Sequence, residues 1–350
     1  MRPRYITREH VQRATSNMYD PMLIDGMIVS ASMAAEDWLH RIFYPRVGVA
    51  LLDWPTAANN DAYRFDLGIN ELISVTRVVS GGTDVPLTDI ILRREDDIDS
   101  PPYGILELRV GSNYCLQASP NGQQSLSITG KFGYNDTTNS TGAVLSGAIT
   151  DSDEQLSITP FNNRVDIGVG SLILIDDEYM IVYGNRYDDT GATLSAGMSA
   201  AKGGTTLLID DTTAIAVNET IIVDSERMYI TAITGSTVTV RRATEGTTLA
   251  GHLANSVVYA ARTFLVSREA CGSTSVVHAD ATGIRVHEFN YLLQELVTAL
   301  VIVALSQSLA EYGKTVGTGT MTRESSGKGL QEIQERVYWA LGRMERGGAI

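Results

Sequence analysis

Apolar and polar positions are spaced in two ways along this chain, with helical spacing at both ends and strand spacing between them. From Met22 to Phe43, apolar residues recur at three- and four-residue steps. Such a stripe predicts an amphipathic helix that offers one face to a partner. A shorter helix is predicted from Thr7 to Ala14, because Thr7 can cap its first turn.

Between residues 63 and 131 the pattern changes to short β-branched runs such as LISVTRVV and ILELRV, separated by turn signals. The pair Gly81-Gly82 between two of these runs predicts a hairpin turn. We therefore expect a small antiparallel sheet here.

Residues 136–265 consist almost entirely of short predicted strands and contain an internal repeat. LILIDDEYMIVYG (172–184) and TIIVDSERMYITA (220–232) match at Ile173/Ile221, Asp176/Asp224, Glu178/Glu226 and Met180/Met228. We interpret each copy as a small β module that pairs with its twin. The first copy is expected to extend to TGATL (190–194), and the polar stretch after Tyr134 is interpreted as a linker.

The matched acidic residues of the repeat are interpreted as hairpin tips. A calcium loop would require alternating Asp and Asn ligands around a central glycine, and neither copy has them. Hairpin tips favour polar residues. We therefore expect Asp176, Glu178, Asp224 and Glu226 to lie at the surface.

The last part of the chain again has helical spacing. Apolar residues from Ile284 to Leu309 predict one long helix with a wide apolar surface. Its continuous run, 296–305, is about half of the ~20 residues that a membrane span needs, so we interpret it as a core helix. A final amphipathic helix is predicted around Leu330 to Met344.

The two ends of the chain have complementary apolar faces, which predicts that they pack together. The predicted fold class is α+β. Residues 1–135 and 266–350 are expected to form a discontinuous helical-bundle domain with a small antiparallel sheet, and residues 136–265 an inserted all-β domain built from two related repeats.

Composition excludes some functions. The formal charge of −14 argues against a surface that grips a nucleic-acid backbone, since such surfaces collect Lys and Arg. The two cysteines, Cys115 and Cys271, show no ligand spacing and are expected to be buried thiols. The first ten residues lack the apolar stretch of a signal peptide, so the protein is expected to remain in the cell that makes it.

The motifs indicate neither catalysis nor a metal. GTGTMTRESSGKG (317–329) lacks the spacing of a phosphate-binding loop, and the five histidines lack ligand spacing and are expected to be solvated or capping residues. The acidic run at 95–99 is interpreted as a solvated loop, although a hydrolase built on acidic clusters stays a minor hypothesis. We expect no enzyme, no cofactor and no metal.

Four segments together resemble one protein family. They are SASMAAEDWLHRIF (30–43), Trp54-Pro55, ELISVTRVVSGGTDVPL (71–87) and SPPYGILEL (100–108). This order resembles the head–tail connector (adaptor) proteins of long-tailed bacteriophages and gene transfer agents. The matching positions are Leu72, Ile73, Ser74, Val75, Gly81, Gly82, Pro102 and Tyr103. The resemblance covers about residues 5–134 and, less distinctly, 284–346, and the inserted β-rich module departs from it.

The resemblance implies a virion neck protein that assembles in the host cytoplasm. Family members form a ring, typically a dodecamer, that binds the portal protein and receives the next neck, head-completion or tail protein. Genomic DNA would pass through the ring without specific binding, and no membrane is involved. The negative charge would suit such a channel. The portal-contacting residues would lie on the last helix: Leu330, Ile333, Val337, Trp339, Leu341 and Met344.

A second hypothesis belongs to a different class. The β-rich insert could be a tail-fibre-like or surface-binding module that recognises a glycan or another structural protein. Binding of glycans by this part of the chain, without ring formation, would distinguish it from a connector.

Overall fold

The computed structural model describes residues 1–15, 19–54, 61, 63–94, 100–120, 122–161, 166–309, 315–316, 323–324 and 328–343. Within these residues, four α-helices accompany antiparallel sheets, so the fold class is α+β as predicted. The chain divides into two compact units. The first holds Met1–Ala35, Thr138–Ala270 and Thr274–Val337, and the second holds Glu36–Thr137, Cys271–Ser273 and Tyr338–Ile350.

The second unit contains the predicted small antiparallel sheet. Its four strands run in the order β1 (Arg46–Leu52), β7 (Leu126–Phe132), β3 (Leu72–Ser80) and β4 (Thr83–Val85). A three-stranded sheet of β2 (Arg64–Asp66), β6 (Ile105–Leu108) and β5 (Ile90–Arg93) shares its core, which includes Phe65, Leu106, Ile128 and Phe132. The predicted Gly81-Gly82 turn joins β3 to β4, with φ of 56° and 86°.

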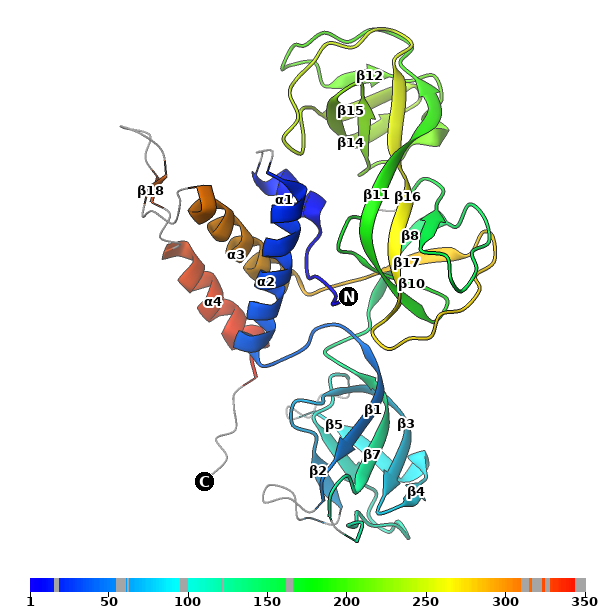
Figure 1. Ribbon diagram of the computed structural model, residues 1–350, viewed down its shortest axis with the longest axis vertical. Helices are drawn as coiled ribbons and strands as arrows, with labels where there is room; N and C mark the ends of the chain where they lie inside the picture. Colours follow the sequence, from blue (N-terminus) through cyan, green and yellow to red (C-terminus); the bar gives the residue numbers. More distant parts are fainter. Residues whose placement is uncertain are drawn as a thin grey trace. The chain divides into compact units, whose positions relative to one another are not determined.

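The first unit contains a ten-stranded sheet. Along it lie β12 (Thr206–Leu208), β15 (Thr237–Arg241), β14 (Glu226–Thr234), β13 (Thr220–Val223), β16 (Val257–Ala270), β11 (Glu178–Thr193), β10 (Leu172–Ile175), β17 (Gly283–His287) and β8 (Thr138–Val144), and β9 (Gln155–Ser157) pairs with β16. The long strands β11 and β16 run side by side through the whole β-rich part (Figure 1).

Two hydrophobic clusters lie along these long strands. One consists of residues between Ala192 and Ala260. The other is formed by residues 143–182 and 261–284, with Ala216 from between them. The segments that form the second cluster therefore lie before and after the segment that forms the first. Residue 265, expected as a domain boundary, lies inside β16.

Two expectations about this region were wrong. The stretch interpreted as a linker forms β8, where the Thr141 hydroxyl donates a hydrogen bond to the Ile284 carbonyl at 2.8 Å. TGATL does not complete the first copy of the repeat, because Ala192 and Leu194 belong to the cluster that holds the second copy. Thr and Gly conceal strands when composition alone is considered.

The helices are α1 (Arg8–Thr15), α2 (Pro21–Leu39), α3 (Tyr291–Leu309) and α4 (Lys328–Leu341). The first is close to its prediction, whereas α2 ends four residues early, at Leu39, and is followed by His40, whose φ is 51°. The predicted start of α3 at Ile284 was wrong, because Ile284 lies in β17, paired with β10 and β8. The remaining short elements are β18 (Thr315–Val316), β19 (Arg323–Glu324) and the 3-10 turns η1 (Leu87–Asp89) and η2 (Thr212–Ala214).

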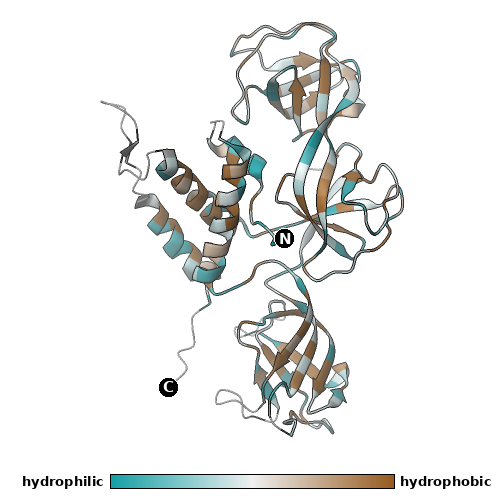
Figure 2. Cartoon of the chain, in the orientation of Figure 1, coloured by the Kyte–Doolittle hydropathy of each residue, from teal (hydrophilic) through white to brown (hydrophobic). Residues whose placement is uncertain are grey.

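Helix α3 is apolar over most of its length (Figure 2). Among the described residues it is the one helix long and apolar enough to cross a membrane, over Tyr291–Ser308, and core helices of soluble proteins also meet that test. Only 28% of these residues are buried within the chain. One face is fully covered by the protein, through Leu293, Leu296, Val297, Val301 and Leu305. By helical geometry, the less covered side carries Leu292, Ala299, Ile302 and Val303.

Both cysteines are free thiols, as predicted, but their surroundings differ. Cys115 is exposed, contrary to the expectation that it is buried. Burial raises the pKa of Cys271 to about 12, so its side chain stays a neutral thiol at physiological pH.

Candidate functional site

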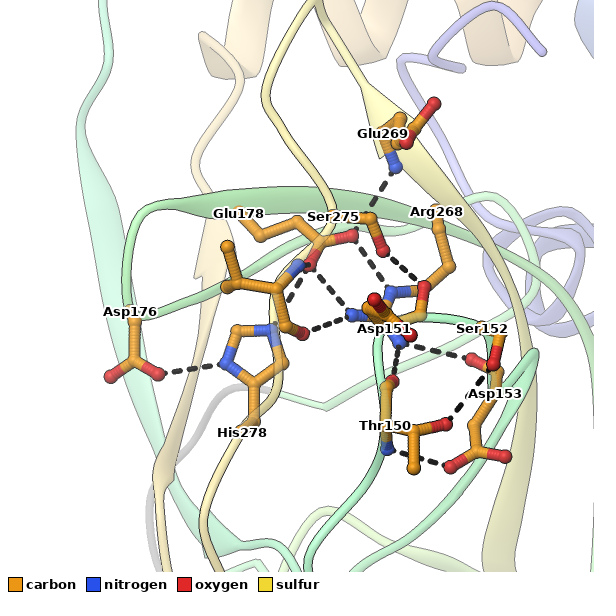
Figure 3. Close-up of polar contacts among 11 residues, drawn as sticks. Thr150, Asp151, Ser152, Asp153, Asp176, Glu178, Arg268, Glu269, Ser275 and His278 are labelled. Carbon is orange, nitrogen blue, oxygen red and sulfur yellow. Dashed lines mark hydrogen bonds and ion pairs between the residues drawn. The ribbon is translucent and has the colours of Figure 1, made fainter.

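The acidic hairpin tips of the repeat lead into two buried clusters of charged side chains. The β10–β11 turn is formed by Asp176 and Asp177, since Ile175 pairs with Glu178. Asp176 has a φ of 51°, in the left-handed region that Asp tolerates better than most residues. Glu178 is 0% exposed and points into the protein (Figure 3). The expectation that it lies at the surface was wrong.

The first cluster, called the Glu178 cluster, consists of Asp176, Glu178, Arg268 and His278. Arg268 Nε and Nη2 each lie 2.7 Å from an oxygen of Glu178, so the pair is bidentate. His278 Nε2 lies 3.1 Å from Glu178 Oε2, and its Nδ1 lies 2.7 Å from Asp176 Oδ2. The cluster thus joins β11 and the β10–β11 turn to two segments far along the chain, the one that carries Arg268 and the one that carries His278 (Figure 3).

Backbone groups complete the Glu178 cluster. The N–H groups of Val276 and Glu269 donate to the buried carboxylate at 3.0 and 3.3 Å. The guanidinium donates to the carbonyls of Thr150, Asp153 and Val276 at 2.6, 3.1 and 2.6 Å. A buried charge is tolerated when its hydrogen-bonding capacity is filled in this way. The cluster therefore fixes two loops against β11 and β16.

The second cluster, called the Glu226 cluster, has the same design with Asp224, Glu226, Arg242 and His252. Arg242 Nε and Nη2 lie 3.0 and 2.5 Å from the Glu226 oxygens. His252 Nε2 lies 2.9 Å from Glu226, and its Nδ1 lies 2.7 Å from Asp224. The φ of Asp224 is 52°, almost the same as that of Asp176.

The correspondence extends to the backbone neighbours of the two clusters. In the Glu226 cluster, the N–H groups of Ala243 and Ala250 donate to the carboxylate at 2.9 and 3.0 Å. The arginine donates to the carbonyls of Ser199, at 2.7 Å, and Ala250. Each histidine also pairs through its backbone, His278 with Ile149 and His252 with Met198. The Glu178 and Glu226 clusters therefore make the same kinds of backbone contact.

The carboxylates at the centres of the clusters stay ionised. Burial by itself would raise the pKa of Glu178, but hydrogen bonds from Arg268, two backbone N–H groups and His278 outweigh it and lower the pKa to about 2. The pKa of Glu226 is lowered for the same reasons, again against the effect of burial. Both ring nitrogens of each histidine lie within hydrogen-bonding distance of carboxylate oxygens.

This arrangement suits a structural role. A general base needs a ring nitrogen with a free lone pair in reach of a substrate. In His278 and His252 both nitrogens are engaged and the rings are buried, so neither ring can accept a substrate proton. The clusters hold strands and loops together.

Acid should destabilise the clusters. The pKa of Glu178 is about 2 in the folded chain, against 4.5 for an ordinary glutamate. Its contribution to stability is therefore complete above pH 4.5 and is lost as pH falls towards about 2. We expect the melting temperature of the β-rich part to drop steeply across this window, as measured by calorimetry. A melting temperature that stays constant down to about pH 2 would contradict this role of the carboxylate.

The residues predicted to contact a portal lie on and after α4. Val337 and Leu341 are buried, with 0% and 3% of their surface exposed, so they are packing residues within the chain. Leu330 and Ile333 are half-buried, whereas Trp339 is 76% exposed. Met344 lies outside the described residues. Trp339 is therefore the predicted contact residue that the chain leaves most accessible.

The residues that complete the two clusters were missed from the sequence. All five histidines were expected to be solvated or capping, but His252 and His278 are buried in the clusters, and His287 is also buried. The sequence analysis predicted no role for Arg242 or Arg268. A signal was present, since arginine and histidine are separated by ten residues in both cases (252 − 242 and 278 − 268).

Comparisons with known proteins leave the chain without an assigned family. No protein-family model matches the chain, and neither curated proteins nor solved structures give a significant match.

Proposed function

We propose that this chain is a structural protein of a bacteriophage virion neck or a related gene transfer agent. Copies of it form a ring below the portal, typically a dodecamer, which joins the DNA-filled capsid to the next neck or tail protein. The ring continues the DNA channel. With a formal charge of −14 per chain, its wall repels DNA rather than binding it.

The observation that supports assembly best is the incomplete burial of α3. Only 28% of Tyr291–Ser308 is buried within one chain, although most residues there are apolar or small. Leaving such a helix half-covered in water is unfavourable by about 25 cal/mol for each Å² of apolar surface. A neighbouring copy that covers Leu292, Ala299 and Ile302 would remove this cost.

The β-rich part supports a projecting role. We propose that it consists of two related modules, the second inserted into the first, each closed by its own Asp-Glu-Arg-His cluster. Two modules joined through the long strands β11 and β16 make one continuous element. Such an element could hold neck fibres or decorations outside the ring.

Ring formation can be tested on the purified chain. We expect rings by negative-stain microscopy, alone or with portal particles, and a mass of many copies by light scattering. Ile302→Glu should lower the assembled fraction by at least about tenfold, because a charge at the centre of the interface costs more than 1.4 kcal/mol.

Leu253→Glu is the matched control. Leu253 is 80% exposed in a loop of the β-rich part, so a charge there should leave assembly unchanged. A chain that stays monomeric with and without portal particles would contradict the proposal. Equal loss of assembly in both variants would show that α3 is not the interface.

The surface-binding alternative is favoured by a different observation. Next to the two buried histidines, the loops carry Leu253, 80% exposed, and Val277, 66% exposed. Exposed aliphatic residues on equivalent loops could contact a glycan or another structural protein. Binding of the full chain to a glycan array, reduced by Leu253→Glu, would favour this second candidate.

A further inference from the structure

Helix α2 exposes an apolar stripe to solvent. Met22, Gly26, Ser30 and Met33 follow one another at steps of four, four and three residues, so they lie on one side of the helix. All four are exposed, Met22 by 82% and Met33 by 41%. Methionine side chains adapt their shape to a partner and are frequent at binding surfaces. We call these four residues the α2 face.

No charge interrupts the α2 face. Between Met22 and Ala34 the helix has one charged residue, Asp25. Its carboxylate is held by the chain itself, since Arg8 Nε donates to Asp25 Oδ1 at 2.9 Å and Arg4 Nη1 lies 3.1 Å from the same oxygen. The exposed side of a helix normally carries charged and polar residues, and an exposed apolar surface marks a contact with a partner.

Packing within the chain does not explain Gly26. Glycine in the interior of a helix is less favourable than alanine, so it needs a reason to be there. A Cβ at Gly26 would have no heavy atom within 4 Å, so no neighbour in the chain requires a small residue. The small residues Gly26 and Ser30 would instead let a second helix approach closely between Met22 and Met33.

A ring needs two different surfaces on each copy. In a closed ring of more than two copies, one patch of each copy contacts a different patch of the next. The ring proposed above uses the less covered side of α3 as one patch. A contact of α3 with α3 of another copy would have two-fold symmetry and would end at a dimer. A second patch is therefore required, and α2 has the same length as α3, 19 residues each.

We propose that the α2 face of each copy receives the less covered side of α3 from the neighbouring copy. This inference rests on the ring proposed above. The two surfaces are complementary in shape, because α3 offers branched side chains such as Leu292 and Ile302, whereas α2 offers small residues at Gly26 and Ser30. Contact removes the apolar side chains of both helices from water. Each copy then uses α3 towards one neighbour and α2 towards the other.

Exchanging charges across the contact tests this arrangement in the full chain. Ser30 is the central residue of α2, and Ile302 lies two residues beyond the centre of α3 (302 − 300), so the two positions come close for either relative direction of the helices. Ser30→Lys should lower the assembled fraction by at least about tenfold, as expected for Ile302→Glu. An equimolar mixture of the two variants should recover assembly, because the introduced glutamate of one copy meets the introduced lysine of the next. Light scattering and negative-stain microscopy measure both effects.

Two further variants separate contact from folding. Ser236→Lys makes the same change at an exposed serine in the β14–β15 turn, so it should assemble like the wild type and should not rescue Ile302→Glu. Gly26→Leu should keep the helical circular dichroism, since space is open around Gly26. It should still lower assembly, because the larger side chain holds the neighbouring helix away.

The outcomes distinguish this inference from the ring itself. If wild-type rings form and Ser30→Lys assembles equally well, or if the mixture does not recover, α2 is not the partner of α3 and the inference is overturned while the ring stands. Wild-type chains that stay monomeric, with and without portal particles, overturn both. If circular dichroism shows that Ser30→Lys does not fold, Met22→Lys, at a position that is 82% exposed, decides instead, and assembly at the wild-type level overturns the inference.

Discussion

Replacing Arg268 with alanine should lower the free energy of unfolding of the β-rich part by about 3–5 kcal/mol. The substitution leaves Glu178, which is 0% exposed, without the cation that contacts both of its oxygens. It also leaves the carbonyls of Thr150 and Val276 without a donor. Urea unfolding followed by circular dichroism measures the change, and hydrogen exchange should show the loss around β10, β11 and the loop before His278.

Arg186→Ala is the matched control for this prediction. Arg186 also lies on a long strand and pairs with an acid, Asp188, at 2.7 Å, but 64% of its side chain is exposed. An ion pair in water contributes about 0–1 kcal/mol, so the control should be nearly neutral. Arg242→Ala should reproduce the large effect in the Glu226 cluster. Similar losses for Arg268 and Arg186 would mean that burial of the pair is not what matters.

The sequence predicted most elements correctly because their periodicity is local. The stripe of α2, the strands around Gly81-Gly82 and the matched hairpins each depend on neighbouring residues. The start of α3 was misplaced because Ile284 and Val286 fit a helical stripe as well as the alternation of β17. Three to five residues do not distinguish these periods.

The buried clusters could not be predicted from hairpin patterns alone. Locally, an Asp-x-Glu sequence at a turn indicates a solvated tip, and Asp176 does remain 56% exposed. Glu178 is buried only because Arg268, ninety residues further along the chain (268 − 178), reaches it. Burial of an acid depends on its partner, and the partner is set by tertiary structure.

The order of the repeated segments along the chain also concealed how the two copies are arranged. TGAVLSGAIT (141–150) and TGATLSAGMS (190–199) are a further matched pair, and their threonines Thr141 and Thr190 make equivalent hydrogen bonds to carbonyls of Ile284 and Val258. An expectation of consecutive copies assigns the second of these segments to the first copy. In the structure the hydrophobic cluster of residues 143–182 and 261–284 closes, through β16 and β17, only after the cluster between Ala192 and Ala260 is complete.

This nesting predicts that the fragment Asp188–Arg262 folds alone. All thirteen residues of its hydrophobic cluster lie between Ala192 and Ala260, and the complete Glu226 cluster lies within it. The two ends of the fragment lie next to each other, since Asp188 on β11 pairs with Ala260 on β16. Domains of about 55–65 residues can already fold by themselves. We expect one cooperative thermal transition by circular dichroism and dispersed amide signals by NMR.

A fragment of equal length that follows the chain instead of the fold, residues 138–212, is the control. It contains β8 and the whole β10–β11 hairpin of the Glu178 cluster, but it lacks Arg268, His278 and the strands that close that cluster. Glu178 would be left without its cation, so this fragment should stay unfolded. No transition in Asp188–Arg262 would mean that the β-rich part folds as a single unit. A cooperative transition in the control would mean that the folding units follow the order of the chain and are not nested. Within Asp188–Arg262, Arg242→Ala should abolish the transition, because a cost of about 3–5 kcal/mol is comparable to the whole stability of so small a domain.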